Sequence, residues 1–181
     1  MTYPCSHWKS GKAHPMSHQE HEMEAPKVLD VGVLTLSDTR DASTDKSGAM
    51  IQELFRQAGH NIVRYSVIRE DPERIEATLR AWLSEPLSAI ITNGGTGLTS
   101  RDGTIEVARR LMQKELDGFG ELFRLISYQQ IGPAAMLSRA TAGLACGRML
   151  ICLPGSTKAV RLATTRLILP QIGHMIREAR R

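Results

Sequence analysis

The chain has 181 residues, of which 41% are hydrophobic and 4% aromatic, and its formal net charge is +4. This length favours a single domain, and no apolar run approaches the roughly 18 residues that a membrane span requires, which excludes membrane and fibrous classes. Residues 151–181 carry six basic side chains and one acidic side chain. The low aromatic content nevertheless provides few surfaces for stacking bases, so we do not expect nucleic acid as a partner.

The first 26 residues form a leader that lacks the apolar stretch of a secretory signal, and we expect it to be disordered. It contains Cys5 and several histidines, which are ligand types that Zn²⁺ or Ni²⁺ prefers. The histidines are His7, His14, His18 and His21. Metal binding is the less favoured interpretation, because few apolar residues could order the segment. The three cysteines of the chain have no paired spacing, which predicts a reducing, cytoplasmic location.

From Val28 onward, apolar runs alternate with helical periods, which predicts one domain over residues 27–181. The expected fold is α/β and doubly wound, with a mostly parallel sheet and helices on both faces. Residues 28–36 are predicted to form a strand that is buried on both sides. A helical stripe follows, and Gly59 has the position of a left-handed C-terminal cap.

A second strand is expected over residues 61–68, and Asp71 with Pro72 then provides an N-cap and a first-turn proline for the next helix. A third strand over residues 88–92 leads into a glycine-rich turn, which is followed by a helix over residues 104–112.

The remaining pattern predicts a helix over residues 117–132 and a hairpin that turns at Cys146 and Gly147. A helix is expected to begin after Ser156. Pro170 is expected to end that helix, because proline lacks the backbone N–H, and a last helix is predicted over residues 171–180.

Ligands of open parallel sheets bind beyond the carboxyl ends of the strands, where loops lead into helix N-termini. Three segments are expected there, namely residues 37–47, 94–103 and 154–156. Gly94, Gly95 and Gly97 would let successive N–H groups point at one anion, as in a phosphate-binding loop. Tight packing is the alternative explanation. The glycine order matches neither the dinucleotide fingerprint nor the P-loop.

Arg101 and Asp102 follow the glycine turn directly. An arginine can neutralise phosphate, whereas a carboxylate beside an anion requires a cation such as Mg²⁺. Asp102 could instead cap the helix that begins near Thr104. Asp45 is one of three aspartates in the first loop, and Ser156 could either contact an anion or cap its helix. Because no nucleophile lies beside a general base, the pattern favours phosphoryl or nucleotidyl transfer.

Six segments together resemble the molybdenum cofactor biosynthesis proteins of the MoaB/Mog type, from about Val28 to the C-terminus. They are Leu36-Ser37-Asp38, Asp45-Lys46-Ser47-Gly48, Asn93-Gly94-Gly95-Thr96-Gly97 with Arg101-Asp102-x-Thr104, Gly118-Phe119-Gly120-Glu121-Leu122-Phe123-Arg124, Leu137-Ser138-Arg139 and Leu153-Pro154-Gly155-Ser156. The resemblance implies a molybdopterin-binding fold that assembles as homo-trimers or homo-hexamers. It also implies a reaction in which Mg-ATP transfers AMP to the terminal phosphate of molybdopterin and pyrophosphate is released.

The resemblance assigns Asp102 and Asp45 as catalytic residues and Mg²⁺ ligands. The substrate-binding residues that it implies are Gly94, Gly95, Thr96, Gly97, Arg101, Glu121, Ser138, Gly155 and Ser156. The chain departs from adenylyltransferases at Glu70, where they typically have aspartate, and at Ile105, where a proline is common. The alternative is therefore a non-catalytic molybdopterin-binding or scaffolding protein of the same pathway.

Overall fold

The computed structural model describes residues 26 and 28–180, so the prediction for the leader falls almost entirely outside the described residues. The described part contains a six-stranded sheet in the order β2-β1-β3-β6-β5-β4. The parallel strands are β1 (Asp30–Leu36), β2 (Asn61–Ile68), β3 (Ala89–Asn93) and β6 (Arg148–Leu153). The antiparallel strands are β5 (Thr141–Ala145) and β4 (Lys114–Glu115).

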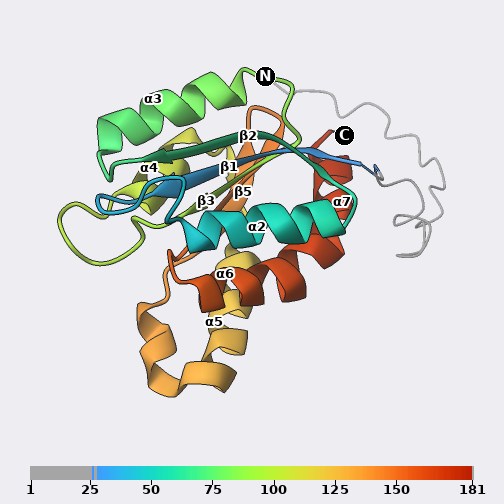
Figure 1. Ribbon diagram of the computed structural model, residues 1–181. Coiled ribbons are helices and arrows are strands. Elements are labelled where there is room, and N and C mark those ends of the chain that lie inside the picture. The colour runs from blue at the N-terminus through green and yellow to red at the C-terminus, as the bar shows by residue number, and fades with distance from the viewer. Residues whose placement is uncertain (1–25, 27, 181) are drawn as a thin grey trace, which may run out of the picture.

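Helices cover both faces of the sheet and bury two separate apolar cores (Figure 1). One face packs against α3 (Pro72–Leu83) and α4 (Thr104–Leu111). The other packs against α2 (Lys46–Gln57), α5 (Asp117–Ile131), α6 (Thr157–Ala163) and α7 (Leu169–Ala179). The prediction of a doubly wound, mostly parallel α/β fold is therefore confirmed.

Local sequence signals act as expected at several element boundaries. Gly59 has a φ of 84° after α2 and donates its N–H to Arg56 O at 2.9 Å, as a left-handed C-terminal cap does. Asp71 accepts the N–H of Arg74 at 2.8 Å and so caps α3. Cys146 and Gly147 both have positive φ, which suits the two-residue turn that joins β5 to β6.

The prediction that Pro170 ends a helix is wrong. A π-helix, η2 (Thr164–Ile168), joins α6 directly to α7, and Pro170 lies in the first turn of α7. The Leu169 N–H bonds to Thr164 O five residues back, immediately before the residue that has no N–H. A wider π turn of this kind is a common way for a helix to continue past an irregularity in its hydrogen bonds.

Two short elements were not predicted: the two-residue strand β4 and the 3-10 helix η1 (Gly132–Leu137). Helix α5 and η1 extend away from the sheet, at the bottom of Figure 1. Six large apolar side chains on these two helices are each more than half exposed: Leu122, Leu125, Tyr128, Ile131, Met136 and Leu137. Within the described residues, no helix combines the length and apolar character that crossing a membrane would need.

Candidate functional site

The glycine-rich turn leaves the carboxyl end of β3, in the middle of the parallel strands. Gly94 and Gly95 have φ values of 96° and 62°, which L-residues with side chains rarely adopt. A Cβ atom at Gly94 would also lie closer than 3.0 Å to Leu36 O, and one at Gly97 would lie 2.8 Å from the Asp102 carboxylate. The glycines therefore serve close backbone approach, which was the alternative explanation for the motif.

The amide group of Gly94 is used within the protein. Gly94 donates its N–H to Leu153 O at 3.0 Å, which ties the turn to the end of β6. The N–H groups of Gly95 and Gly97 lie near the carboxylates of Glu70 and Asp102 and lower the pKa of each of them. Gly94 is therefore not available to an anion, and anion binding by the other amides of the turn stays a prediction.

Asp102 folds the end of the turn back on itself. Its carboxylate accepts the Thr99 hydroxyl at 2.6 Å and the Thr99 N–H at 2.9 Å. These hydrogen bonds, led by that of the hydroxyl, hold the pKa of Asp102 below its usual value. Asp102 does not cap α4, whose N-cap is Gly103, so that alternative is wrong.

The carboxylates of Glu70, Asp102 and Asp38 lie close enough beside the turn to influence one another, and the Glu70 N–H donates to Asp38 Oδ1 at 3.2 Å. Burial raises the pKa of Glu70, and the negative charges of Asp102 and Asp38 raise it further. Arg101 lies against this group and pairs with Asp38 at 3.0 Å. No set of three or more His, Cys, Asp or Glu residues among those described is close enough to hold a metal by itself. The sequence singled out Glu70 only because adenylyltransferases typically have an aspartate at this position. The structure places Glu70 beside the glycine turn.

Asp45 lies inside the protein and is only 2% exposed. One carboxylate oxygen accepts the Gly48 N–H at 2.9 Å, which caps α2, and lies 2.9 Å from the Ser47 hydroxyl. The other accepts Thr35 Oγ1 at 2.5 Å and the Tyr65 hydroxyl at 2.9 Å. Burial alone would raise the pKa of Asp45, but these hydrogen bonds outweigh it and lower the pKa.

The role of Asp45 as a catalytic Mg²⁺ ligand stays a prediction. In the structure its carboxylate organises the buried start of α2 and accepts hydrogen bonds from the Gly48 N–H and from the hydroxyls of Thr35 and Tyr65. The residue type and the loop are typical of a metal ligand, but the number of donors around Asp45 could not be inferred from the sequence.

Arg40 connects the loop after β1 with the loop after β6. Its Nη1 atom donates to Ser47 Oγ at 2.8 Å and to Gly155 O at 3.2 Å, and its Nη2 atom donates to Gly155 O at 3.3 Å. Gly155 also approaches the glycine turn, since a Cβ atom there would lie 3.2 Å from Gly94 Cα. The three loops predicted to meet at the carboxyl edge of the sheet are thus in direct contact.

Two other predicted binding residues, Ser156 and Ser138, lie at the start of α6 and directly after η1. Ser156 caps α6 by accepting the Ala159 N–H at 3.2 Å. Ser138 precedes Arg139, which donates to Gly97 O at 2.8 Å and pairs with Glu106, so this segment reaches the glycine turn. Arg139 is a site residue that the sequence marked only as part of a motif.

Glu121 is exposed on α5 and lies apart from the glycine turn. It lines a polar pocket with Asp117, Arg124 and Thr141. The structure therefore does not bring Glu121 together with the other predicted site residues of this chain.

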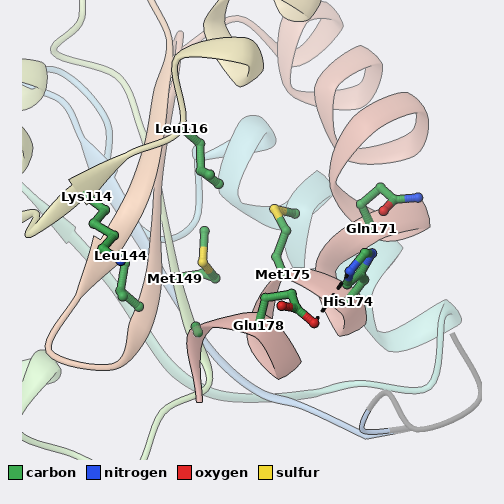
Figure 2. Close-up of a pocket in the computed structure, with 9 residues that line it drawn as sticks. Lys114, Leu116, Leu144, Met149, Gln171, His174, Met175 and Glu178 are labelled. Atoms are coloured by element: carbon green, nitrogen blue, oxygen red, sulfur yellow. Dashed lines mark ion pairs between the residues drawn. The ribbon is translucent and has the colours of Figure 1, made fainter. Parts of the chain in front are cut away.

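A larger apolar pocket of about 380 Å³ lies between α7 and the strands β4 to β6. Figure 2 shows Met149 and Met175 inside it, with the ion pair of His174 and Glu178 at its edge. Lys114 of β4 and Leu116, which follows β4, also line this pocket. None of the predicted site residues lines this pocket, so its size does not identify the functional site.

The family described as a probable molybdopterin binding domain matches residues 32–174 of the chain. The chain belongs to this family. The molybdenum cofactor biosynthesis protein B of Bacillus cereus is 47% identical over 168 residues, covering 92% of this chain and 99% of the relative. The protein of the same name from Bacillus subtilis is 44% identical with the same coverage.

Solved structures of the family agree with the fold. A crystal structure of a molybdenum cofactor biosynthesis protein B shares 46% identity and has a TM-score of 0.83, covering 86% of this chain and 98% of that chain. The tungsten cofactor synthesizing protein MoaB from Pyrococcus furiosus shares 37% identity with a TM-score of 0.79, covering 87% of this chain and all of that one. The Mog protein from Mycobacterium ulcerans shares 26% identity. Family membership assigns the chain to molybdenum cofactor biosynthesis.

Proposed function

We propose that the protein binds molybdopterin and adenylylates its terminal phosphate with Mg-ATP, releasing pyrophosphate. The observation that carries the proposal is the pair of carboxylates, Glu70 and Asp102, held beside the glycine turn at the carboxyl edge of a family-typical sheet. Arg101, Arg139 and Arg40 surround the same turn and provide positive charge for phosphate groups. The free thiols of Cys146 and Cys152 suit a cytoplasmic place of action.

The side chains present fit one Mg²⁺ ion. This ion usually keeps several waters and binds one or two carboxylates together with substrate phosphates. Burial and then the negative charge of Asp102 raise the pKa of Glu70, and a cation bound by these carboxylates would relieve the repulsion. Mg²⁺ would neutralise charge on the transferred phosphoryl group, with Asp102 and Glu70 as its protein ligands.

The reaction itself requires no protein nucleophile. An oxygen of the molybdopterin phosphate forms a bond to the α-phosphorus of ATP, and the bond from that phosphorus to the pyrophosphate oxygen breaks. The residues of the site would hold the two phosphorylated substrates in line and neutralise part of their negative charge. The fixed contacts among the three loops suit this positioning.

A second candidate is a protein that binds and presents molybdopterin without adenylylating it. Two observations favour it: Glu70 stands where an aspartate was expected, and the identity to the protein B relatives exceeds that to the Mog protein of Mycobacterium ulcerans. Such a protein would bind molybdopterin equally well with and without ATP.

The deciding experiment incubates the full chain with molybdopterin, ATP and Mg²⁺ and measures pyrophosphate and AMP-pterin. Asp102→Ala should lower the rate roughly 100-fold or more, the scale seen when one charge contact of a transition state is removed. The control Glu53→Ala, on the exposed side of α2, should leave the rate unchanged. Formation of AMP-pterin by Asp102→Ala at the unmodified rate would contradict the role of Asp102. Molybdopterin binding without any product would favour the second candidate.

We also propose that the protein is a homo-oligomer, with a trimer or hexamer implied by the resemblance. The support is the apolar surface of α5 and η1, where side chains at intervals of three residues from Leu122 to Ile131 are more than half exposed. Apolar surfaces of this kind usually mark sites of protein association.

A further inference from the structure

The hydrogen bonds of Arg40 leave one side of its guanidinium group without a partner. A guanidinium has five N–H groups arranged in a planar fork. Gly155 O receives one N–H from Nη1 and one from Nη2, and Ser47 Oγ receives the second N–H of Nη1. Among the described residues, the Nε–H and the second Nη2–H of Arg40 have no acceptor. These two groups form the parallel pair that binds phosphate or carboxylate oxygens bidentately.

The free edge of Arg40 lies where the three loops of the site meet. The side chain is 36% exposed, so the edge can be reached from solvent while the opposite side is fixed. Gly155 and Gly94 are in close approach beneath it, and the Nη2 atom itself would lie 3.5 Å from a Cβ atom at Gly155. The charged edge is therefore preorganised by backbone and hydroxyl contacts.

The ion pair that Arg40 forms inside the protein involves its Nη1 atom, which lies 3.7 Å from the buried Asp45 carboxylate. This pair lies on the side of the guanidinium away from Nε and leaves the Nε and Nη2 edge open. Asp38 of the same loop is paired with Arg101 instead. The Gly94 N–H next to this junction bonds to Leu153 O, so the unpaired edge of Arg40 is the donor that an anion can reach there.

We propose that Arg40 binds a phosphate group of the substrate through its Nε–H and Nη2–H groups. The ligand class is a phosphate monoester or diphosphate whose oxygens match the spacing of the guanidinium fork. The proposal rests on the proposed function for the identity of the substrate, but phosphate binding at this edge does not depend on adenylyl transfer. Arg40 thereby supplies an anion contact at the junction where the Gly94 amide is already bonded to Leu153 O.

The test uses the full chain with ¹⁵N-labelled arginine and inorganic phosphate or pyrophosphate as the probe. The Nε–H resonance of Arg40 is identified as the one missing from the spectrum of Arg40→Lys. Titration should shift this resonance in a saturable manner. Arg40→Lys keeps the charge but loses the fork, and should weaken pyrophosphate binding about 10-fold or more. The control Arg64→Lys, at an exposed pair with Glu85, should bind like the unmodified chain.

An Arg40 resonance that stays unchanged at saturating pyrophosphate would overturn the proposal, and so would equal pyrophosphate affinity of Arg40→Lys. If Arg40→Lys does not fold, Arg40→Gln retains a donor for Gly155 O and serves the same comparison. Shift of the resonance without AMP-pterin formation would uphold phosphate binding and reject the adenylylation proposal. Formation of AMP-pterin with no shift of the resonance on adding molybdopterin would reject the role of Arg40 and retain the enzyme.

Discussion

Hydrogen bonds rather than solvent keep the Asp45 carboxylate ionised in the interior. The Gly48 N–H of α2 and the hydroxyls of Thr35 and Tyr65 donate to its two oxygens, and the Ser47 hydroxyl lies 2.9 Å from one of them. The partial burial of Tyr65, together with its hydrogen bond to Asp45 and the negative charge of that carboxylate, raises the pKa of the Tyr65 hydroxyl, which therefore stays protonated. Removing the charge of Asp45 should affect the stability of the protein before it affects any ligand.

We expect Asp45→Asn to lower the free energy of unfolding by about 2 kcal/mol or more, since it replaces charge-assisted hydrogen bonds in a buried site. Because the folded pKa of Asp45 lies below its ordinary value of 3.8, its contribution is fully present above that value and is lost as the pH falls through the lower folded pKa. Urea unfolding of Asp45→Asn and of the unmodified chain, at pH 7 and near pH 3, measures the difference in their free energies of unfolding. The control Glu53→Gln should leave stability nearly unchanged, and a pH-independent loss for Asp45→Asn would contradict the assignment.

Glu70 should show the opposite behaviour. Its folded pKa lies above the ordinary value of 4.5, so the ionised carboxylate costs stability as the pH rises through that range. We expect Glu70→Gln to raise the free energy of unfolding at pH 7, with the gain vanishing below about pH 4, and to weaken Mg²⁺ binding. Urea unfolding and Mg²⁺ titration check the two effects. Loss of stability at pH 7 would show that the charge of Glu70 is favourable in the fold.

The glycine turn is an element whose backbone depends on the absence of side chains. Gly94→Ala would force a Cβ atom against Leu36 O at a φ of 96°, and we expect destabilisation by roughly 1–3 kcal/mol. Gly118→Ala is the matched control, because Gly118 lies within α5 with open space around it and alanine should stabilise the helix by about 0.5–1 kcal/mol. Thermal unfolding of both variants gives the comparison. Equal melting temperatures for the two variants would be inconsistent with this geometry.

Elements with strong local signals could be predicted from the sequence, and contacts between distant segments could not. Gly59 and Asp71 act through their immediate neighbours, so their roles as caps follow from their positions. Arg40 and Gly155 are 115 residues apart, and nothing in either segment indicates their contact. Pro170 shows a different limit, because a π turn of the preceding residues accommodates it.

The acidic residues of the site show why residue type alone is insufficient. Asp45 and Glu70 are both acidic residues that follow or precede predicted elements near the site, yet hydrogen-bond donors surround Asp45 whereas the nearby charges of Asp102 and Asp38 raise the pKa of Glu70. Only the packing of three separate loops distinguishes these environments. The sequence therefore predicted which three loops meet at the carboxyl edge of the sheet, while the surroundings of individual side chains required the structure.

At the scale of the whole molecule, the apolar surface of α5 and η1 predicts self-association. We expect Leu125→Glu to shift the protein towards the 20.0 kDa monomer, because a charge would be placed in a desolvated contact. Val63→Glu, on the outermost strand β2, is the control and should keep the mass of the unmodified protein. Light scattering after gel filtration measures both. A monomeric mass for the unmodified chain would reject the oligomer proposal.

The insertion of β6 between β3 and β5 has a consequence for synthesis on the ribosome. Gly94 bonds to Leu153 and Arg40 bonds to Gly155, so both residues gain these contacts only after β6 and the loop that follows it have been made. A nascent chain that stops before residue 148 has its acidic and glycine-rich loops but lacks the strand that brings them together. The junction of the three loops therefore forms more than 50 residues after the glycine-rich turn itself has been synthesised.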